Sequence, residues 1–487
     1  MAGSMEEESS PMHIVVFPWL AFGHIIPFLE LSEQLAKRGH LVTFVSAPRN
    51  LAKLRPVLPE VRPRIRLFPL PLPRVDGLPD GAESTADVPP EKVELLKVAI
   101  DGLAAPFAAF LADACAAGEA TTGGHGKKPD WIVIDFAQHW LPAIADEHKV
   151  PCAVFLIVPA ACVAFIGPKE LNDAHPRSAA EDFTVRPPWL PSSSLLAFRG
   201  HEAEWVAGPS NPTPRASLTS PASGRRRTAA RSSCAAAAAR WTARSAPSSA
   251  TSSASPSSPP ASSVLAPDDA AAARAAADND DEETAALMRW LDAQPARSVL
   301  YVAFGSEAPL TPDHIHALAL GLERAGVRFV WVLRSPIGGE RPSLPDGFER
   351  RVAGRGVVRV GWVPQVRVLA HAAVGAFMTH AGWSSLMESF LFGHPLVMLP
   401  LFADQGLTAR LMTERRVGLE VPWRDGVGLL GGEDVAATVR RVMVEEEGEV
   451  FMRNAKELQE VLWDTAKQEK YIDELLDHLL LMRRRGD

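Results

Sequence analysis

The chain alternates short, strongly apolar runs with segments whose apolar residues recur at helical spacing, and this alternation constrains the fold most. The run "HIVVF" near the start precedes a segment in which Ile25, Phe28, Leu29 and Leu35 share one face of a helix, and "HLVTFVS" follows it. Runs that are apolar on both faces are typical of parallel strands covered by helices on both sides. The pattern therefore predicts a β-α-β unit and an α/β protein.

The same alternation continues to about residue 423 and predicts two halves of similar size. Apolar runs at residues 130–136 and 151–158 belong to the first half, and a run that starts at Ser298 opens the second. Each half is expected to form one α/β lobe with a parallel sheet, and ligands of such sheets bind at the carboxyl ends of the strands, here in a cleft between the lobes. Amphipathic helices are expected from about residue 446 to residue 482.

Composition excludes several classes of protein. The chain has 487 residues, a net charge of −8 and a pI near 6.0, so it has no overall positive field for nucleic acid or an anionic membrane. Because the start is acidic, we expect no secretory leader. The sequence contains no run of about 18 apolar residues, so we expect no membrane span. The four cysteines lack metal or disulfide spacing, so we expect a reduced, cytoplasmic location.

A G-x-G-x-x-G pattern occurs at Gly426, Gly428 and Gly431, but we do not interpret it as a dinucleotide site. The following helix is expected to begin only after Asp434, so the glycines fill a loop. No second strand ending in an acid follows within about 20 residues, as the dinucleotide pattern requires. Hydride chemistry is therefore a poor interpretation of this chain.

The most informative motif covers residues 362–405. A strand "GAFMTH" meets a helix through the small-residue turn "AGWSS", and such a turn presents backbone N–H groups and the positive end of the helix dipole to a phosphate. His380 and Ser385 can add hydrogen-bond donors, and Glu388 can accept from a ribose diol. A plain strand-turn-helix is the alternative, but it does not explain why so many polar residues gather at strand carboxyl ends.

These 44 residues resemble the plant secondary product signature of UDP-dependent glycosyltransferases. The match holds at Trp362, Pro364, Gln365, Leu369, His371, Gly375, Phe377, Thr379, His380, Gly382, Trp383, Ser385, Glu388, Gly393, Pro395, Pro400, Asp404 and Gln405. The resemblance extends over most of the chain and implies the GT-B fold, with two Rossmann-like lobes whose parallel sheets face a cleft. It also implies an enzyme that uses a UDP-sugar as co-substrate and a small molecule as acceptor.

The resemblance assigns a role to each part of the donor site. Trp362 would stack on uracil, the ribose would bind Glu388, and Asp404 with Gln405 would bind the sugar hydroxyls. The diphosphate would bind the amides of the turn and nearby side chains. The donor-binding residues implied in this way are Gly23, Ser306, Trp362, Val363, Gln365, His380, Gly382, Trp383, Ser384, Ser385, Glu388, Asp404 and Gln405.

The chain departs from the family pattern at two of these positions. Ala381 stands where the family usually has cysteine, and we expect this change to be neutral. Ser384 stands where the family usually has asparagine, whose amide contacts the phosphates. Because serine is shorter, we expect weaker donor binding, by roughly 0.5–1.5 kcal/mol.

His24 and Asp135 are the candidate catalytic residues. A histidine at a helix start is commonly a cap or a packed side chain, but both residues follow strands of the first half, where strand carboxyl ends meet. A carboxylate bonded to one imidazole nitrogen fixes the tautomer, so that the other nitrogen acts as a base. In the family that the chain resembles, these residues form the catalytic dyad.

The resemblance implies an inverting transfer that needs no metal and no other cofactor. The stretches "PWLAFGHIIPFLELS" and "GLPDGAESTADVP" are similar to a branch that extends a sugar already attached to a flavonoid, anthocyanidin or terpenoid. Gln405 favours UDP-glucose as donor, but that branch also uses UDP-rhamnose, so both stay open. A monomer without nucleic-acid partners is expected.

The predicted lobes cover residues 12–270 for the acceptor and 286–460 for the UDP-sugar, and C-terminal helices at 461–487 would pack back on the first lobe. Residues 209–263 interrupt this pattern: from Asn211 to Ser263 there are seven arginines and no lysine, aspartate or glutamate. Our hypothesis is an out-of-frame translation that disrupts the acceptor lobe. A disordered linker and a genuine basic insertion that binds an anionic partner are the alternatives. If the acceptor lobe is disrupted, the chain is expected to be a catalytically impaired, donor-binding homologue.

Overall fold

The computed structural model describes residues 10–116, 125, 127–207, 282–305, 308, 310–334, 342–424 and 429–484. The chain forms two compact units. The first unit consists of the described parts of Met1–Ile157 and Ile472–Asp487, and the second of the described parts of Val158–Thr213 and Ala237–Tyr471. Ser306, the segment 209–263 and the glycines 426 and 428 lie outside the described residues, so the predictions made on them are untested.

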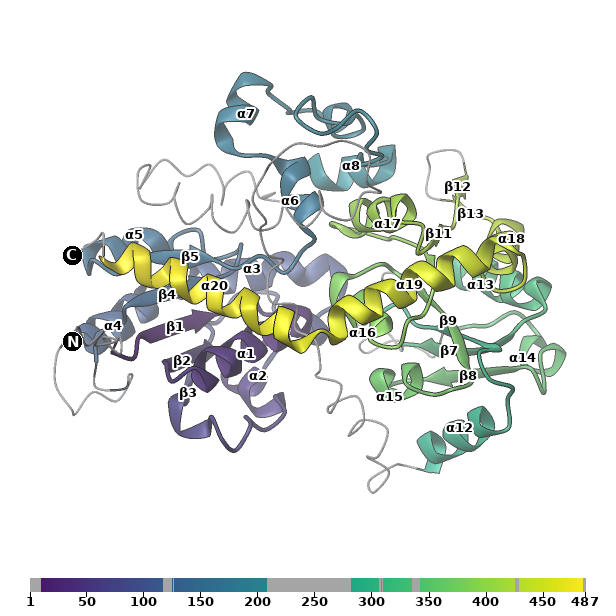
Figure 1. Cartoon of the computed structure of the whole chain (residues 1–487), viewed down its shortest axis with the longest axis horizontal. Helices are drawn as coiled ribbons and strands as arrows, with labels where there is room; N and C mark the ends of the chain where they lie inside the picture. The colour runs from purple at the N-terminus through teal and green to yellow at the C-terminus, as the bar shows by residue number, and fades with distance from the viewer. Residues whose placement is uncertain are drawn as a thin grey trace, which may run out of the picture. The chain divides into compact units, whose positions relative to one another are not determined.

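The first unit is built on a five-stranded parallel sheet in the order β3-β2-β1-β4-β5 (Figure 1). Its strands are β1 (His13–Phe17), β2 (Leu41–Ser46), β3 (Ile65–Pro69), β4 (Trp131–Ile134) and β5 (Cys152–Val154). As predicted, α1 (Phe22–Lys37) joins β1 to β2 and buries its apolar face. Gly39 adopts φ +89° after this helix, a conformation that glycine adopts without strain.

Helices from both ends of the chain complete the first unit. They are α2 (Pro48–Lys53), α3 (Val93–Asp101), α4 (Ala104–Cys115), α5 (Leu141–Glu147) and the part of α20 (Thr465–Arg484) that starts at Ile472. Phe107 of α4 stacks on Phe17 of β1 with ring centroids 5.5 Å apart. The indole of Trp131 in β4 donates to the carbonyl of Leu479 in α20 at 3.2 Å. The core therefore includes a helix that the sequence places over 300 residues away from β4.

The second unit is built on a six-stranded parallel sheet in the order β11-β10-β9-β6-β7-β8. The strands are β6 (Val299–Val302), β7 (Arg328–Leu333), β8 (Gly356–Val360), β9 (Val374–Thr379), β10 (Leu396–Met398) and β11 (Gly418–Glu420). The helices between residues 282 and 463 are α12 (Glu282–Asp292), α13 (Pro312–Ala325), α14 (Phe348–Arg351), α15 (Gln365–Leu369), α16 (Trp383–Phe390), α17 (Gln405–Glu414), α18 (Gly432–Met443) and α19 (Glu447–Trp463). A short hairpin of β12 (Trp423–Arg424) and β13 (Leu429–Leu430) precedes α18.

Side chains of each strand alternate between two apolar layers, one on each face of this sheet. In β6, Val299 and Tyr301 pack with the layer that contains residues of α16 and α17. Leu300 and Val302 pack with the layer that contains residues of α13 and α18. Both faces are buried, which explains why the strands are continuous apolar runs in the sequence.

Two helix boundaries test the predictions directly. The predicted start and end of α13 are confirmed, since the Thr311 hydroxyl accepts from the backbone N–H of His314 at 3.2 Å and Gly326 is left-handed. The predicted start after Asp434 is wrong. Helix α18 begins at Gly432, and Gly431 is its N-cap, because these glycines lack the side chains that would clash with Arg424, Asp434 and Leu320.

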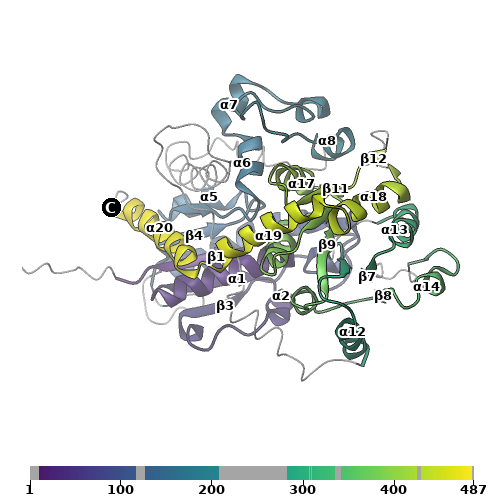
Figure 2. The same ribbon diagram turned by 45° about the vertical axis from the view of Figure 1, so that its right-hand side comes forward.

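Helices α6 (Ala160–Ile166), α7 (Lys169–Ala174) and α8 (Gly200–Ala207) belong to the second unit although they precede residue 282. Figures 1 and 2 both show α6 and α8 beside α17. The eight residues Gln405–Met412 of α17 are all buried. The predicted lobe boundary at residue 270 lies outside the described residues and stays a prediction.

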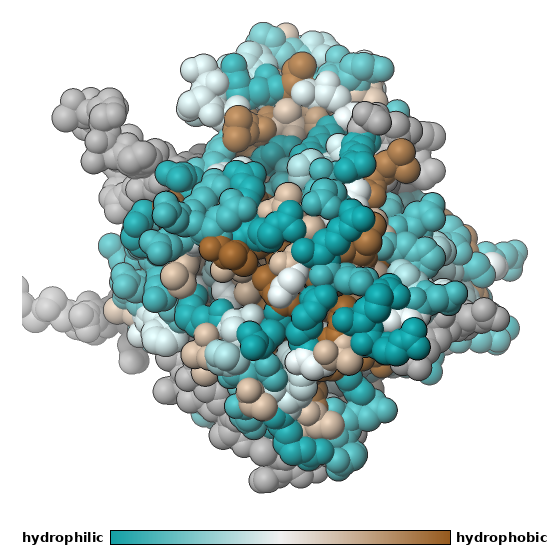
Figure 3. Space-filling model, turned by 90° about the vertical axis from the view of Figure 1, so that its right-hand side faces the viewer, coloured by the Kyte–Doolittle hydropathy of each residue, from teal (hydrophilic) through white to brown (hydrophobic). Residues whose placement is uncertain are grey.

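The described surface and helices have a hydropathy that is ordinary for a folded protein. The face in Figure 3 is mostly hydrophilic, with apolar residues in scattered groups. In the part of the chain that the structure describes, no single helix is long and apolar enough to cross a membrane. Only α3 and α4 taken together, with a 42° bend between them, meet that test of length and composition.

We predict that Gly375→Ala destabilises the second unit. Gly375 lies in β9, where the register with β6 shifts, and a Cβ here would collide with the carbonyl oxygen of Arg297. Overpacking against backbone should lower the free energy of unfolding by about 1–3 kcal/mol, measured as a lower thermal midpoint. The control is Gly200→Ala, since a Cβ there meets open space. Equal midpoints for the two variants would contradict this account of β9.

Candidate active site

The structure brings His24 and Asp135 together in the first unit. His24 is the third residue of α1, which follows β1, and Asp135 directly follows β4. Strands β1 and β4 are parallel neighbours, so their carboxyl ends lie side by side. The Nδ1 atom of His24 lies 2.7 Å from Oδ2 of Asp135, a hydrogen-bonded pair. We call these two residues the dyad.

Asp135 is buried, and three polar contacts besides the one with His24 hold it in place. Its carboxylate accepts from the backbone N–H groups of Trp19 at 3.1 Å and Phe136 at 2.8 Å. Its own N–H donates to Oε1 of Gln138 at 3.2 Å, and the Gln138 amide donates to the carbonyl of Pro18 at 3.1 Å. Gln138 thus ties the ends of β1 and β4 together. Sequence reasoning missed it, although a polar residue three positions after the strand-ending Asp135 was a usable signal.

The dyad geometry assigns a tautomer to His24. An ionised carboxylate only accepts hydrogen bonds, so Nδ1 of His24 carries the proton and Nε2 is the basic nitrogen. The His24 side chain is 21% exposed, in contrast to its partner, and its ring packs on Phe136 with centroids 5.6 Å apart. A fixed, partly accessible imidazole of this kind can remove a proton from a hydroxyl group.

In the second unit, two glycines make room for the ring of His380 at the end of β9. Gly382 is the N-cap of α16, and a Cβ on it would collide with Nε2 of His380. Gly305, after the neighbouring strand β6, has φ +74°, and a Cβ there would lie 2.9 Å from the same ring. The turn also contains Ala381 at φ +64°. Sequence reasoning did not select Gly305, whose signal was its place shortly after the buried strand β6.

His380 is neutral at ordinary pH. Burial lowers its pKa from 6.5 to about 4, because a charged imidazolium loses its hydration there. The hydroxyl of Thr379 lies 3.4 Å from its Nδ1 atom. The ring can therefore act as a hydrogen-bonding group at the N-terminus of α16, where the helix dipole favours an anion.

Three predicted donor-binding residues form one hydrogen-bonded group. The amide of Gln365, at the start of α15, donates to Oε2 of Glu388 at 2.7 Å and to the hydroxyl of Ser385 at 3.3 Å. Burial raises the pKa of Glu388, and the bond from Gln365 opposes that rise. Trp362, between β8 and α15, is 68% exposed, an unusual position for so large an aromatic side chain and one that suits stacking on a base.

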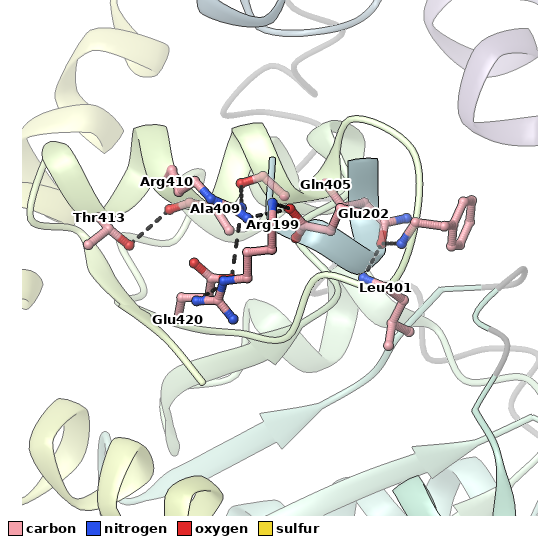
Figure 4. Close-up of polar contacts among 10 residues, drawn as sticks. Arg199, Glu202, Leu401, Gln405, Ala409, Arg410, Thr413 and Glu420 are labelled. Carbon is pink, nitrogen blue, oxygen red and sulfur yellow. Dashed lines mark hydrogen bonds and ion pairs between the residues drawn. The ribbon is translucent and has the colours of Figure 1, made fainter. Parts of the chain in front are cut away.

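Gln405 has a contact that the sequence did not predict. It is the first residue of α17, and its side-chain oxygen accepts from the backbone N–H groups of Leu401 at 2.9 Å and Phe402 at 3.2 Å (Figure 4). The amide therefore holds the loop between β10 and α17. Asp404, the N-cap residue of α17, lies at the end of the same loop. The predicted role of both residues in binding sugar hydroxyls stays a prediction.

The remaining predicted site residues lie beside these groups in the chain. Gly23 precedes His24 in α1, Val363 is buried next to Trp362, and Trp383 and Ser384 open α16. Among the residues that the structure describes, no three His, Cys, Asp or Glu side chains gather where they could hold a metal ion. The prediction of a reaction without metal is untested by this observation.

Comparisons with known proteins point to one family. Residues 265–466 match the family described as "UDP-glucoronosyl and UDP-glucosyl transferase". UDP-glycosyltransferase 91D1 of Stevia rebaudiana is 36% identical over 482 residues, which cover 98% of this chain and 94% of the relative. Soyasaponin III rhamnosyltransferase of Glycine max is 33% identical over 479 residues, which cover 97% and 96%.

A solved structure supports the fold. The complex of a UDP-glucosyltransferase from Polygonum tinctorium, capable of glucosylating indoxyl, with 3,4-dichloroaniline aligns with a TM-score of 0.70. It is 23% identical, and the alignment covers 96% of this chain and 98% of that one. The predicted α/β class and GT-B fold are confirmed. With relatives above 30% identity over nearly their whole length, the chain belongs to the UDP-glycosyltransferase family of enzymes.

Proposed function

We propose that this enzyme moves a hexose from a UDP-sugar to a hydroxyl group of a plant secondary metabolite, with inversion at the anomeric carbon. The observation that carries the proposal is the dyad, in which His24 Nδ1 lies 2.7 Å from the buried carboxylate of Asp135. The acceptor in this proposal is a sugar hydroxyl of a flavonoid, anthocyanidin or terpenoid glycoside. The donor is UDP-glucose or UDP-rhamnose.

In the proposed reaction, Nε2 of His24 takes the proton of the acceptor hydroxyl. The acceptor oxygen forms a bond to the anomeric carbon from the face opposite UDP, while the bond from that carbon to the phosphate oxygen breaks. UDP leaves with the electron pair. Asp135 stabilises the imidazolium that forms, as a carboxylate does in serine-protease triads. Because attack and departure occur on opposite faces, the configuration inverts.

The donor half of the proposal rests on residues of the second unit. The N-terminus of α16, with neutral His380 and the glycine turn, suits the diphosphate, whose departure it would stabilise. Gln365 and Glu388 form a polar group suited to ribose, and exposed Trp362 suits the base. Asp404 and Gln405 at the start of α17 are the proposed sugar-binding residues.

The choice of donor and acceptor is supported by relatives only. One relative is named as a rhamnosyltransferase and the aligned structure is named as a glucosyltransferase, which keeps both donor sugars in the proposal. The name of the first also supports a glycoside acceptor. A cytoplasmic monomer without nucleic-acid partners and without a metal or other cofactor completes the proposal.

A second candidate function is donor binding without turnover. The arginine-rich, acid-free composition of residues 209–263 favours it, since the family pattern stops before this segment and resumes after it. The two candidates separate in one assay of the full chain. Binding of UDP together with glycoside formation supports the enzyme, and binding of UDP without any product supports the second candidate.

We predict that His24→Ala lowers kcat by about 10²–10⁴-fold, because removal of a general base costs a factor of that size. UDP binding should stay within about twofold, because Trp362, Glu388 and His380, the residues proposed for uracil, ribose and diphosphate, are unchanged. The matched control is His139→Ala, which removes a half-exposed histidine 3.6 Å from Asp101 and should leave kcat unchanged. Product formation that survives His24→Ala would refute the base assignment.

We predict that Ser384→Asn strengthens donor binding. Ser384 is the second residue of α16, where a longer amide side chain can reach a phosphate oxygen. One added hydrogen bond should lower the KM for the UDP-sugar by about two- to tenfold, with little change in the KM for the acceptor. Steady-state kinetics with each substrate varied in turn measures both values. A KM for the donor that rises would show that serine fits this turn better.

We predict that donor binding tightens as the pH falls. The pKa of His380 is about 4 in the free protein, and a neighbouring diphosphate favours the charged imidazole, so the pKa is higher in the complex. Binding then takes up a proton, and the affinity rises as pH falls toward the pKa of the complex. UDP-glucose, whose phosphates do not titrate near neutrality, should bind about two- to fivefold more tightly near pH 5.5 than near pH 7.5. Calorimetry tests this, and the same pH dependence in His380→Gln would contradict it.

A further inference from the structure

Helix α17 carries the proposed sugar-binding residues Asp404 and Gln405 at its start, so its position determines where their side chains lie. The helix is buried along most of its length, and other parts of the second unit cover it. Cys162 of α6 touches the hydroxyl of Thr408, with 3.7 Å between sulfur and oxygen. A charged contact comes from α8, which lies beside α17 in Figures 1 and 2.

Glu202 of α8 makes the central contact of this packing. One oxygen of its buried carboxylate accepts from the guanidinium of Arg410 in α17, and from the backbone N–H of Arg199 at 2.7 Å (Figure 4). The second bond resembles that of a capping box, because Glu202 in the first turn of α8 binds the N–H of the residue before the helix. The orientation of Glu202 is thus fixed by its own helix as well as by Arg410.

The start of α17 is shaped to receive this carboxylate. Gly406 follows Gln405, and a Cβ at Gly406 would collide with the carboxylate of Glu202. The guanidinium of Arg410 also donates to the carbonyl of Gly406. Glu202 and Arg410 therefore hold the first turn of α17 at the residue adjacent to Gln405, whose side chain in turn holds the loop at Leu401.

Two more charged residues complete the cluster. Arg199 lies 3.0 Å from an oxygen of Glu420 in β11, and that oxygen lies 3.8 Å from Arg410. Burial raises the pKa of Glu420, and the two arginines oppose that rise. Two acids thus face two arginines, which balances charges that would be costly to bury alone. We call Arg199, Glu202, Arg410 and Glu420 the α17 cluster.

We propose that Glu202 and Arg410 are positioning residues for donor selectivity: through the first turn of α17 they set the placement of Asp404 and Gln405 and so determine which UDP-sugar binds best. This inference rests on the proposed function, in which Asp404 and Gln405 contact the sugar. The α17 cluster makes no contact with the sugar itself in this proposal. The groups proposed for uracil, ribose and diphosphate lie on α15, α16 and the residues before them, so UDP itself should bind independently of Glu202.

The test is binding of UDP, UDP-glucose, UDP-galactose and UDP-rhamnose to the full chain and to Glu202→Gln, measured by calorimetry with thermal midpoints. Selectivity is the ratio of Kd values between the weakest and the tightest UDP-sugar. Loss of one charged contact should reduce this ratio by about tenfold, while the Kd of UDP changes by less than about twofold. Glu202→Ala should reduce this selectivity ratio further than Glu202→Gln does. Arg410→Lys keeps the positive charge and serves as a second variant that we expect to fold.

The matched control contacts the same helix at its other end. Glu414 in the last turn of α17 accepts from the backbone N–H of Leu195 and from the hydroxyl of Ser194, so Glu414→Gln weakens the packing of the same preceding segment far from Gln405. This variant should keep the wild-type selectivity. Unchanged selectivity in Glu202→Gln, an equal loss of affinity for UDP and all UDP-sugars, or a wild type that does not discriminate among them would each overturn the inference. Failure of the wild type to bind UDP would instead refute the proposed function.

Discussion

Parallel strand pairing is the constraint on which both candidate sites depend. In a parallel sheet all carboxyl ends lie at one edge, so residues that are far apart in sequence meet there without any special loop. In the first unit this pairing places β1 beside β4 and brings together two side chains separated by 111 positions. In the second unit it places β6 beside β9, so that Gly305 and Gly382 accommodate the ring of His380.

Because of this constraint, much of the fold and of the site could be predicted from the sequence. Buried parallel strands are continuous apolar runs, and polar residues at their carboxyl ends stand out against them. The pairing of His24 with Asp135 and the phosphate-binding turn before α16 follow from this pattern, whereas the roles of Trp362 and Gln365 come from the family resemblance. Strand β3 was not predicted, because only Ile65 of its five residues is buried and its apolar run is short.

Other features could not be predicted because they depend on contacts between distant segments. Nothing in the sequence near Gln405 indicates that its side-chain oxygen binds the loop at Leu401. Nor does the sequence indicate that Glu202 pairs with Arg410, which lies 208 positions away. Glu202 reads as an ordinary surface acid of a short helix. Only the packing of α8 on α17 shows that it is buried and charge-paired. Two members of the α17 cluster, Arg199 and Glu202, lie shortly before the compositional change at residue 209.

The central claim is a single displacement in which the dyad activates the acceptor and UDP leaves from the opposite face. The anomeric configuration of the product tests it most directly. Full-length protein would be incubated with UDP-glucose, whose glucose is α-linked, and a panel of flavonoid and terpenoid glycosides, and the product would be analysed by NMR. The account predicts a new β-linked glucose and release of UDP in equal amount. An α-linked product, which requires retention of configuration, would contradict it.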